Sequence, residues 1–149
     1  GKHSEISAIE AMNIAIKLTN NLHRYRNVVR FEVPEEDAFF NGNSGQIQQV
    51  LVNFLTNAIY ATPEGKEITL KVEKEADNVR LIVEDEGVGM SKETLSKVFT
   101  PFFTTKPPGE GTGLGMSISM TIVEEHNGRI DIVSTEGKGT TVSVILPLV

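Results

Sequence analysis

The clearest pattern of apolar positions lies in the segment that follows Asn43. Its apolar residues recur at steps of three and four, as they do on one face of a helix: Ile47, Val50, Leu51, Phe54, Leu55 and Ala58. This stripe predicts a helix with one continuous buried face. Asn43 and Gln46 form a capping-box pattern at its start, and Pro63 and Gly65 predict its end.

Two further segments have helical spacing. The first lies between about residues 6 and 25, and its apolar positions are Ala11, Ala15, Leu18, Leu22 and Tyr25. These positions predict a second buried helical face. Residues 114–126 predict a third helix, closed by Asn127 and Gly128, and residues 92–98 predict a short one.

Apolar and polar residues alternate in other parts of the chain, which is typical of strands with one buried face. The predicted strands are residues 28–33, 68–72, 79–83, 130–132 and 142–146. The second and third of these predict an antiparallel hairpin, as do the last two. The predicted fold is α/β (α+β): a two-layer sandwich with a mixed, mostly antiparallel sheet and helices packed on one face. Residues 1–149 are expected to form a single domain, with residues 1–5 as a cloning remnant.

Composition narrows the class of protein. A hydrophobic content of 39% and a charged content of 23% are those of a soluble globular domain. The absence of cysteine excludes a disulfide framework and a thiolate zinc site. No apolar run approaches the roughly 20 residues of a membrane helix. A net charge of −6 with scattered Lys and Arg disfavours a nucleic-acid surface, and it means that a bound triphosphate would need magnesium, backbone N–H groups or local cations.

Candidate chemistry comes from two asparagines and three glycine clusters that follow them in order. Asn53 and Asn57 lie one turn apart beside the buried helical stripe. The clusters are Asp85-Glu86-Gly87-Val88-Gly89, Gly111-Thr112-Gly113-Leu114-Gly115 and Gly137-Lys138-Gly139-Thr140. The Asp85 carboxylate can accept a hydrogen bond from an amine such as that of adenine, and the second cluster opens a helix whose free N–H groups can bind phosphates. Together they predict a pocket for a magnesium-bound nucleotide under a mobile lid.

On these motifs the chain, from about residue 46 onward, resembles the catalytic, ATP-binding domain of bacterial sensor histidine kinases, which belong to the Bergerat-fold (GHKL) ATPase superfamily. Residues 53–58 are similar to the N box, and the three clusters to the family's glycine boxes. Residues 102–106, Phe-Phe-Thr-Thr-Lys, are similar to the F box. The form of these motifs is closest to that of nitrogen-regulation-type sensor kinases.

The resemblance implies a role for each motif. Asn57 would coordinate Mg²⁺, and Asn53 would sit beside the metal or a phosphate, so these two are the expected catalytic and metal-binding residues. Asp85 would bind the adenine amino group, with Thr140 supporting it through water. Residues 90–111 would form the ATP lid, with Lys106 contacting a phosphate. The other expected nucleotide-binding residues are Gly87, Gly89, Gly111, Thr112, Gly113, Leu114 and Gly115.

The resemblance also implies an activity. The domain would bind Mg-ATP and donate the γ-phosphoryl group to a histidine on a separate dimerisation domain of the same kinase, with a response regulator as an indirect partner. It would be cytoplasmic, with no direct membrane contact and no nucleic-acid partner. The three histidines, His3, His23 and His126, lack the sequence context of a phosphoacceptor. The chain is therefore expected to be a kinase fragment that does not phosphorylate itself.

Two alternatives stay open. An anti-sigma-factor-type serine kinase shares this fold but resembles ATPases that place a glutamate where Asn53 stands. A non-catalytic nucleotide-binding interaction module is the other, because Tyr60 replaces a lysine that many histidine kinases carry. Glu86 is a further departure, since it adds negative charge beside the predicted pocket.

Overall fold

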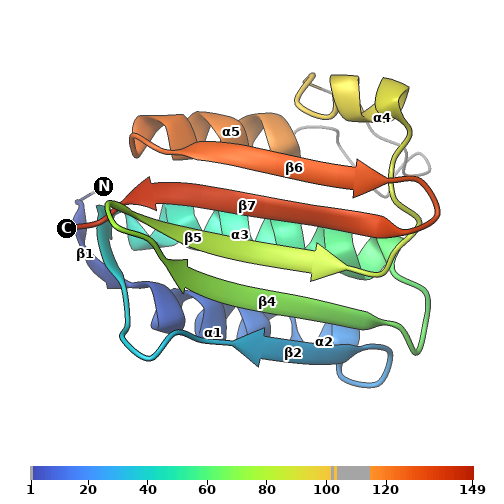
Figure 1. Cartoon of the computed structure of the whole chain (residues 1–149), viewed down its shortest axis with the longest axis horizontal. Coiled ribbons are helices and arrows are strands. Elements are labelled where there is room, and N and C mark those ends of the chain that lie inside the picture. Colours follow the sequence, from blue (N-terminus) through green and yellow to red (C-terminus); the bar gives the residue numbers. More distant parts are fainter. Residues whose placement is uncertain (1, 102, 104–114) are drawn as a thin grey trace.

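A computed structural model describes residues 2–101, 103 and 115–149 (Figure 1). Its elements are β1 (Ser4–Ser7), α1 (Ala8–Leu18), α2 (Asn20–His23), β2 (Val28–Glu32), β3 (Phe39–Gly42), α3 (Ser44–Ala61), β4 (Glu67–Lys74), β5 (Asn78–Asp85), α4 (Lys92–Lys97), α5 (Gly115–Glu125), β6 (Arg129–Thr135) and β7 (Gly139–Pro147). No helix in these ranges is long and apolar enough to span a bilayer.

Five of the strands form a mixed sheet in the order β2-β4-β5-β7-β6. β2 and β4 are parallel, and the remaining neighbours are antiparallel. The long helices lie on one face of this sheet, and α3 packs against both α1 and α5 (Figure 1). The predicted two-layer sandwich is therefore confirmed, as are both predicted hairpins.

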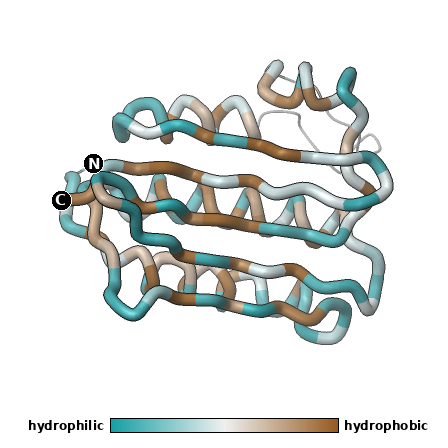
Figure 2. The backbone as a smooth tube through the Cα atoms, in the orientation of Figure 1, coloured by the Kyte–Doolittle hydropathy of each residue, from teal (hydrophilic) through white to brown (hydrophobic). Residues whose placement is uncertain are grey.

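Burial follows the alternation in the strands. On β4 and β5 the side chains that face the helices are buried: Ile68, Leu70, Val72, Val79, Leu81 and Val83. Their neighbours in sequence point to the other face and are polar except for Ile82, so polar and apolar residues largely alternate along the strands (Figure 2). The helix with the clearest stripe, α3, covers this apolar face, and all six predicted stripe positions of α3 are buried. Its start is the predicted one, because the side chain of Asn43 accepts a hydrogen bond from the N–H of Gln46.

The predicted helical face over residues 6–25 is only partly correct. Its first two positions are buried, but the prediction is wrong for three that are exposed: Leu18 (59%), Leu22 (46%) and Tyr25 (85%). The reason is a break at Thr19, whose hydroxyl donates to the carbonyl oxygen of Ala15 at 2.9 Å and ends α1. After the break the buried positions are Thr19 and His23, so the apolar residues that continue the original period face outward.

A second, two-stranded sheet was not predicted. β1 pairs antiparallel with β3, with Ser4 opposite Gly42 and Glu5 opposite Asn41. Residues 4 and 5 therefore take part in the fold of the domain. Phe40, in β3, is fully buried, whereas its neighbour Phe39 is 42% exposed.

Candidate nucleotide site

Asp85 is the last residue of β5, where the strand gives way to the first glycine cluster. Its Oδ1 accepts hydrogen bonds from the N–H groups of Gly87 (2.9 Å) and Thr140 (3.2 Å). Burial raises the pKa of the Asp85 carboxyl, and the two backbone donors oppose this shift without cancelling it. Within the described residues Oδ2 has no hydrogen bond, so this oxygen can accept one from a ligand.

The first and third glycine clusters lie side by side, as the pocket prediction requires. The N–H of Gly137 donates to the carbonyl oxygen of Val88 at 2.7 Å. Gly89 has a φ of 67°, and a Cβ there would lie 2.0 Å from the carbonyl oxygen of Thr135. At Gly87 a Cβ would lie 2.7 Å from Asp85 Oδ1. Glycine is therefore required at both predicted positions for the backbone to pass this close to the carboxylate and to the β6–β7 turn.

The structure also adds a residue that the sequence did not single out. The hydroxyl of Thr140 lies 2.7 Å from that of Ser134, which faces it across the β6–β7 pair. Ser134 Oγ in turn accepts from the N–H of Met90 at 2.8 Å, at the point where the predicted lid begins. Thr140 thus touches the Asp85 carboxylate through its N–H and is held by Ser134 through its hydroxyl. Only the strand register could have identified Ser134.

The two asparagines lie on the flank of α3 that faces α5. Their Nδ2 atoms are both 3.6 Å from the sulfur of Met116. The amide of Asn53 also donates to the hydroxyl of Ser119 at 3.3 Å. A Cβ on Gly115 would lie only 2.3 Å from Asn53 Oδ1, so glycine is needed where α5 begins against α3. The predicted stacking of the two asparagines on one side of the helix is confirmed.

The site residues converge at one end of the molecule. The end of β5, the start of β7 and the start of α5 all lie at the same end of the sheet (Figure 1). Five predicted nucleotide-binding residues lie outside the described residues: Lys106, Gly111, Thr112, Gly113 and Leu114. Of the predicted lid, the structure describes residues 90–101 and 103, and α4 confirms the short helix in it.

The residues present fit a magnesium-bound nucleotide. Amide oxygens such as those of Asn53 and Asn57 are ligands that Mg²⁺ accepts, and Mg²⁺ usually takes few protein ligands and completes its shell with phosphates and water. In the described ranges no group of three His, Cys, Asp or Glu side chains is placed to hold a metal ion. The carboxylate of Asp85 suits a base that carries an amino group.

Glu86, one of the expected departures from the family pattern, follows Asp85 directly in the chain. Glu86 is exposed, and its carboxylate accepts a hydrogen bond from the N–H of Glu67 at 2.8 Å. Glu67 itself pairs with Arg30 at 2.8 Å. The carboxylate of Glu86 is therefore directed to the start of β4. Tyr60, one helical turn beyond Asn57, is 47% exposed.

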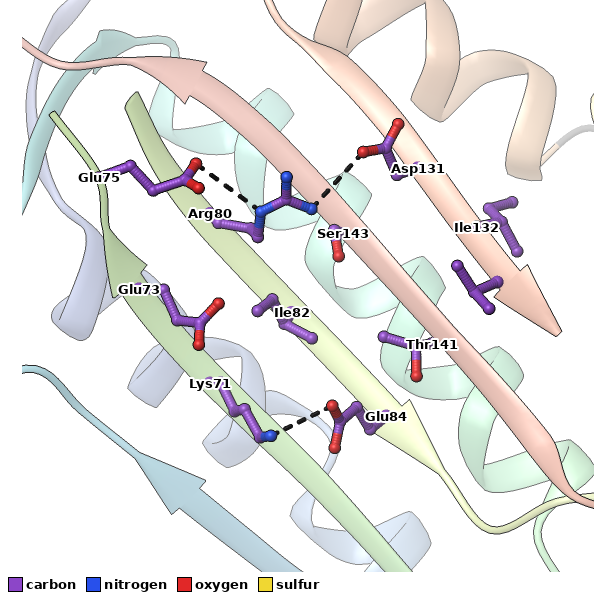
Figure 3. Close-up of a pocket in the computed structure, with 11 residues that line it drawn as sticks. Lys71, Glu73, Glu75, Arg80, Ile82, Glu84, Asp131, Ile132, Thr141 and Ser143 are labelled. Atoms are coloured by element: carbon purple, nitrogen blue, oxygen red, sulfur yellow. Dashed lines mark ion pairs between the residues drawn. The ribbon is translucent and has the colours of Figure 1, made fainter. Parts of the chain in front are cut away.

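The opposite face of the sheet carries a separate hollow of about 670 Å³ (Figure 3). Five of its six charged lining residues pair with one another: Lys71 with Glu84 at 3.2 Å, and Arg80 with both Glu75 at 3.7 Å and Asp131 at 3.5 Å. Neither the asparagines nor Asp85 line it. This face is a solvated surface of paired charges, distinct from the candidate site.

The histidines have structural surroundings. His126 is buried, its Nδ1 lies 2.7 Å from the carbonyl oxygen of Ile122, and its Nε2 accepts from the N–H of Asn43 at 3.0 Å. The tautomer with the proton on Nδ1 satisfies both bonds. The ring of His3 stacks on that of His126, and His23 is buried with Nε2 3.2 Å from the carbonyl oxygen of Ile16.

Comparison with known proteins indicates the same class of protein as the geometry of the candidate site does. Residues 42–149 match the family model of histidine kinase-, DNA gyrase B- and HSP90-like ATPases. Sporulation kinase C of Bacillus subtilis is 40% identical over 113 residues, which are 76% of this chain and 26% of that protein. Sensor histidine kinase ZraS of Escherichia coli is 33% identical over 98% of this chain and 32% of its own length. The chain thus spans about a quarter to a third of these relatives.

A solved structure, the catalytic domain of histidine kinase ThkA, superimposes with a TM-score of 0.87 at 32% identity, covering 99% of this chain and 98% of that one. The fold and the nucleotide site define an ATPase domain of the histidine kinase, gyrase B and HSP90 type. Within that family, the chain belongs to the catalytic, ATP-binding domains of protein-histidine kinases.

Proposed function

We propose that this domain binds Mg-ATP and donates its γ-phosphoryl group to a histidine on a separate dimerisation domain of a two-component sensor kinase. The observation that carries the proposal is the Asp85 carboxylate, held through Oδ1 by two backbone N–H groups while Oδ2 stays available. The chain belongs to the histidine kinase catalytic domains, and this supports both ATP as the nucleotide and phosphoryl transfer to histidine as the reaction.

Asp85 would select the base. Its Oδ2 can accept from the amino group of adenine, whereas guanine offers a carbonyl oxygen at the equivalent position, which a carboxylate repels. Gly87 lets the backbone pass close to this carboxylate and to the carbonyl oxygen of Ala61. Thr140, held by Ser134, would add a water-mediated contact.

Residues of α3 and α5 would bind the phosphates of the nucleotide. Mg²⁺, when bound, would neutralise phosphate charge, and Asn57 would be its ligand, with Asn53 beside the metal or a phosphate. Residues 111–115 would offer backbone N–H groups, and Lys106 a cation, from a lid formed by residues 90–111. Phosphoryl transfer depends mainly on positioning and charge neutralisation, and such an arrangement supplies both.

The phosphoacceptor would come from outside this domain. Both ring nitrogens of His126 are engaged, His23 is buried, and His3 is stacked on His126. The dimerisation domain of the same kinase would supply the acceptor histidine, and a response regulator would receive the group afterwards. Because the donor is ATP, the reaction is proposed to occur in the cytoplasm.

The test is a labelling experiment with [γ-³²P]ATP and magnesium. The domain alone should remain unlabelled, and it should label a histidine-containing dimerisation domain of its kinase when that domain is added. The label should be acid-labile and alkali-stable, as a phosphoramidate is. Acid-stable label on a serine of an added antagonist would instead support a serine kinase, and stable label on any histidine of the isolated domain would contradict the proposal.

A further inference from the structure

Ser119 is a buried residue of α5 with a contact that its own helix does not explain. It is 1% exposed, and its hydroxyl oxygen lies 3.3 Å from Asn53 Nδ2 on α3. Serine and threonine within helices commonly hydrogen-bond a carbonyl one turn back. Thr121, two residues further along α5, does so with Ser117 at 3.1 Å. Within the described residues, Ser119 is instead directed to the asparagine of the neighbouring helix.

Together with the contact to Met116, this hydrogen bond sets which end of the Asn53 amide faces which neighbour. An amide has a donor end and an acceptor end, and only the oxygen can bind a cation. Asn53 Nδ2 donates to two atoms on α5: Met116 Sδ, which can only accept, and Ser119 Oγ, which is the acceptor in this orientation. The opposite end, Oδ1, lies against Gly115, where α5 begins. A flipped amide would place its oxygen against the sulfur of Met116, which has no proton to donate, and its nitrogen at the helix start.

We propose that Ser119 is a positioning residue for Asn53: its hydroxyl holds Nδ2 and thereby presents Oδ1 at the start of α5, toward the magnesium ion. The assignment deepens the proposed function and rests on it. Ser119 would not touch the nucleotide, and it would act only through the orientation of the Asn53 amide.

The expected effect follows from the loss of one hydrogen bond. In Ser119→Ala the amide loses its stronger acceptor and can rotate, so the affinity for ATP in the presence of magnesium should fall about three- to tenfold. Affinity for ATP in EDTA should not change, because without the cation Asn53 Oδ1 has no ligand and its orientation no longer matters. Ser143→Ala is the matched control, since Ser143 is also buried (5% exposed) but lies on the opposite face of the sheet.

A double-mutant cycle separates positioning from packing. Titration calorimetry with ATP, in magnesium and in EDTA, would compare wild type, Ser119→Ala, Asn53→Ala and the double variant. If Ser119 acts through Asn53, Ser119→Ala should have no further effect in the Asn53→Ala background. Equal losses in both backgrounds, or equal losses in magnesium and in EDTA, would overturn the proposal.

A second measurement needs no nucleotide. In ¹H–¹⁵N spectra of the free domain, the side-chain amide protons of Asn53 should shift and exchange faster with water in Ser119→Ala than in wild type. Unchanged Asn53 side-chain resonances would overturn the positioning role. If the wild-type domain failed to bind Mg-ATP, the proposed function would be wrong, and these resonances would still decide whether Ser119 orients Asn53.

Discussion

Replacing Asp85 with asparagine should change nucleotide affinity and the stability of the free domain in opposite directions. Asparagine keeps the shape of the side chain, and its Oδ1 can still accept from the N–H groups of Gly87 and Thr140. The substitution removes the negative charge. It also replaces Oδ2, a hydrogen-bond acceptor, with an NH₂ group, which is a donor. The adenine amino group would then meet a donor.

The loss of affinity can be estimated from the one ligand contact that is changed. A hydrogen bond to a charged group contributes about 1.5–3 kcal/mol, which corresponds to a roughly 10- to 150-fold weaker Kd for ATP. Discrimination against GTP should fall with it, because the repulsion of the guanine carbonyl disappears. Glu84→Gln is the matched control: Glu84 is adjacent on β5, but its carboxylate pairs with Lys71 on the opposite face.

The stability effect has the opposite sign. Burial raises the pKa of the Asp85 carboxyl, so the folded domain holds this proton more tightly than the unfolded chain does. The contribution of this group to the free energy of unfolding therefore decreases as the pH rises from the ordinary pKa of an aspartate through the raised value in the fold. Once the pH exceeds this raised pKa, the wild-type domain carries the cost of the buried charge, and Asp85→Asn removes it.

The assays are titration calorimetry with ATP and GTP, and urea unfolding of the nucleotide-free domain at several pH values. We expect Asp85→Asn to bind ATP more weakly and to be as stable as wild type or more stable at pH 7, with a smaller decrease in stability between mildly acidic and neutral pH. An unchanged ATP affinity, or equal competition by GTP in the wild type, would refute the assignment of Asp85. Lower stability of the variant at pH 7 would refute the pKa argument.

Three further predictions follow from other parts of the site. Asn57→Ala should reduce the ratio of ATP affinities measured by calorimetry in magnesium and in EDTA, and a wild-type domain with equal affinity in both would contradict the magnesium assignment. His126→Ala should lower the free energy of unfolding by about 2–4 kcal/mol, because it opens a cavity and leaves the N–H of Asn43 without its acceptor; a loss below about 1 kcal/mol in denaturant titrations would refute this. Amide hydrogens in residues 91–111 should gain protection from exchange on addition of a non-hydrolysable ATP analogue in magnesium, and Gly113→Ala should reduce that gain, whereas equal protection with and without the analogue would count against a lid.

The elements that the sequence predicted best are those whose burial depends on local geometry. The stripe on α3 and the alternation on β4 and β5 follow directly from the period of a helix or a strand, so each pattern identified its own buried face. The same helical period gave a wrong prediction of burial for Leu18, Leu22 and Tyr25. A period shows which residues share a face only while the helix continues, and the break at Thr19 ends that continuity.

The candidate site also has features that the sequence predicts and features that only the structure shows. Asp85, Gly87 and Gly89 could be found in the sequence because a carboxylate followed by closely spaced glycines has a local meaning at the end of a strand, and the order of the clusters added the resemblance to a known family. Their mutual arrangement was not local. The hydrogen bond from Thr140 to Asp85 joins residues 55 positions apart, and it exists because β7 pairs with β5 in one particular register.

By itself, the sequence determined the sandwich fold, the nucleotide-binding class and the residues with the most distinctive chemistry. Only the tertiary structure decided how those residues are held. The contact between Asn53 and Ser119 spans 66 positions, and it depends on α5 starting against α3 at Gly115. A buried serine in a helix has no distinguishing sequence pattern, because its role depends on which helix packs beside it. Pairings of this kind are set by the packing of the whole domain, which no local pattern of apolar and polar residues encodes.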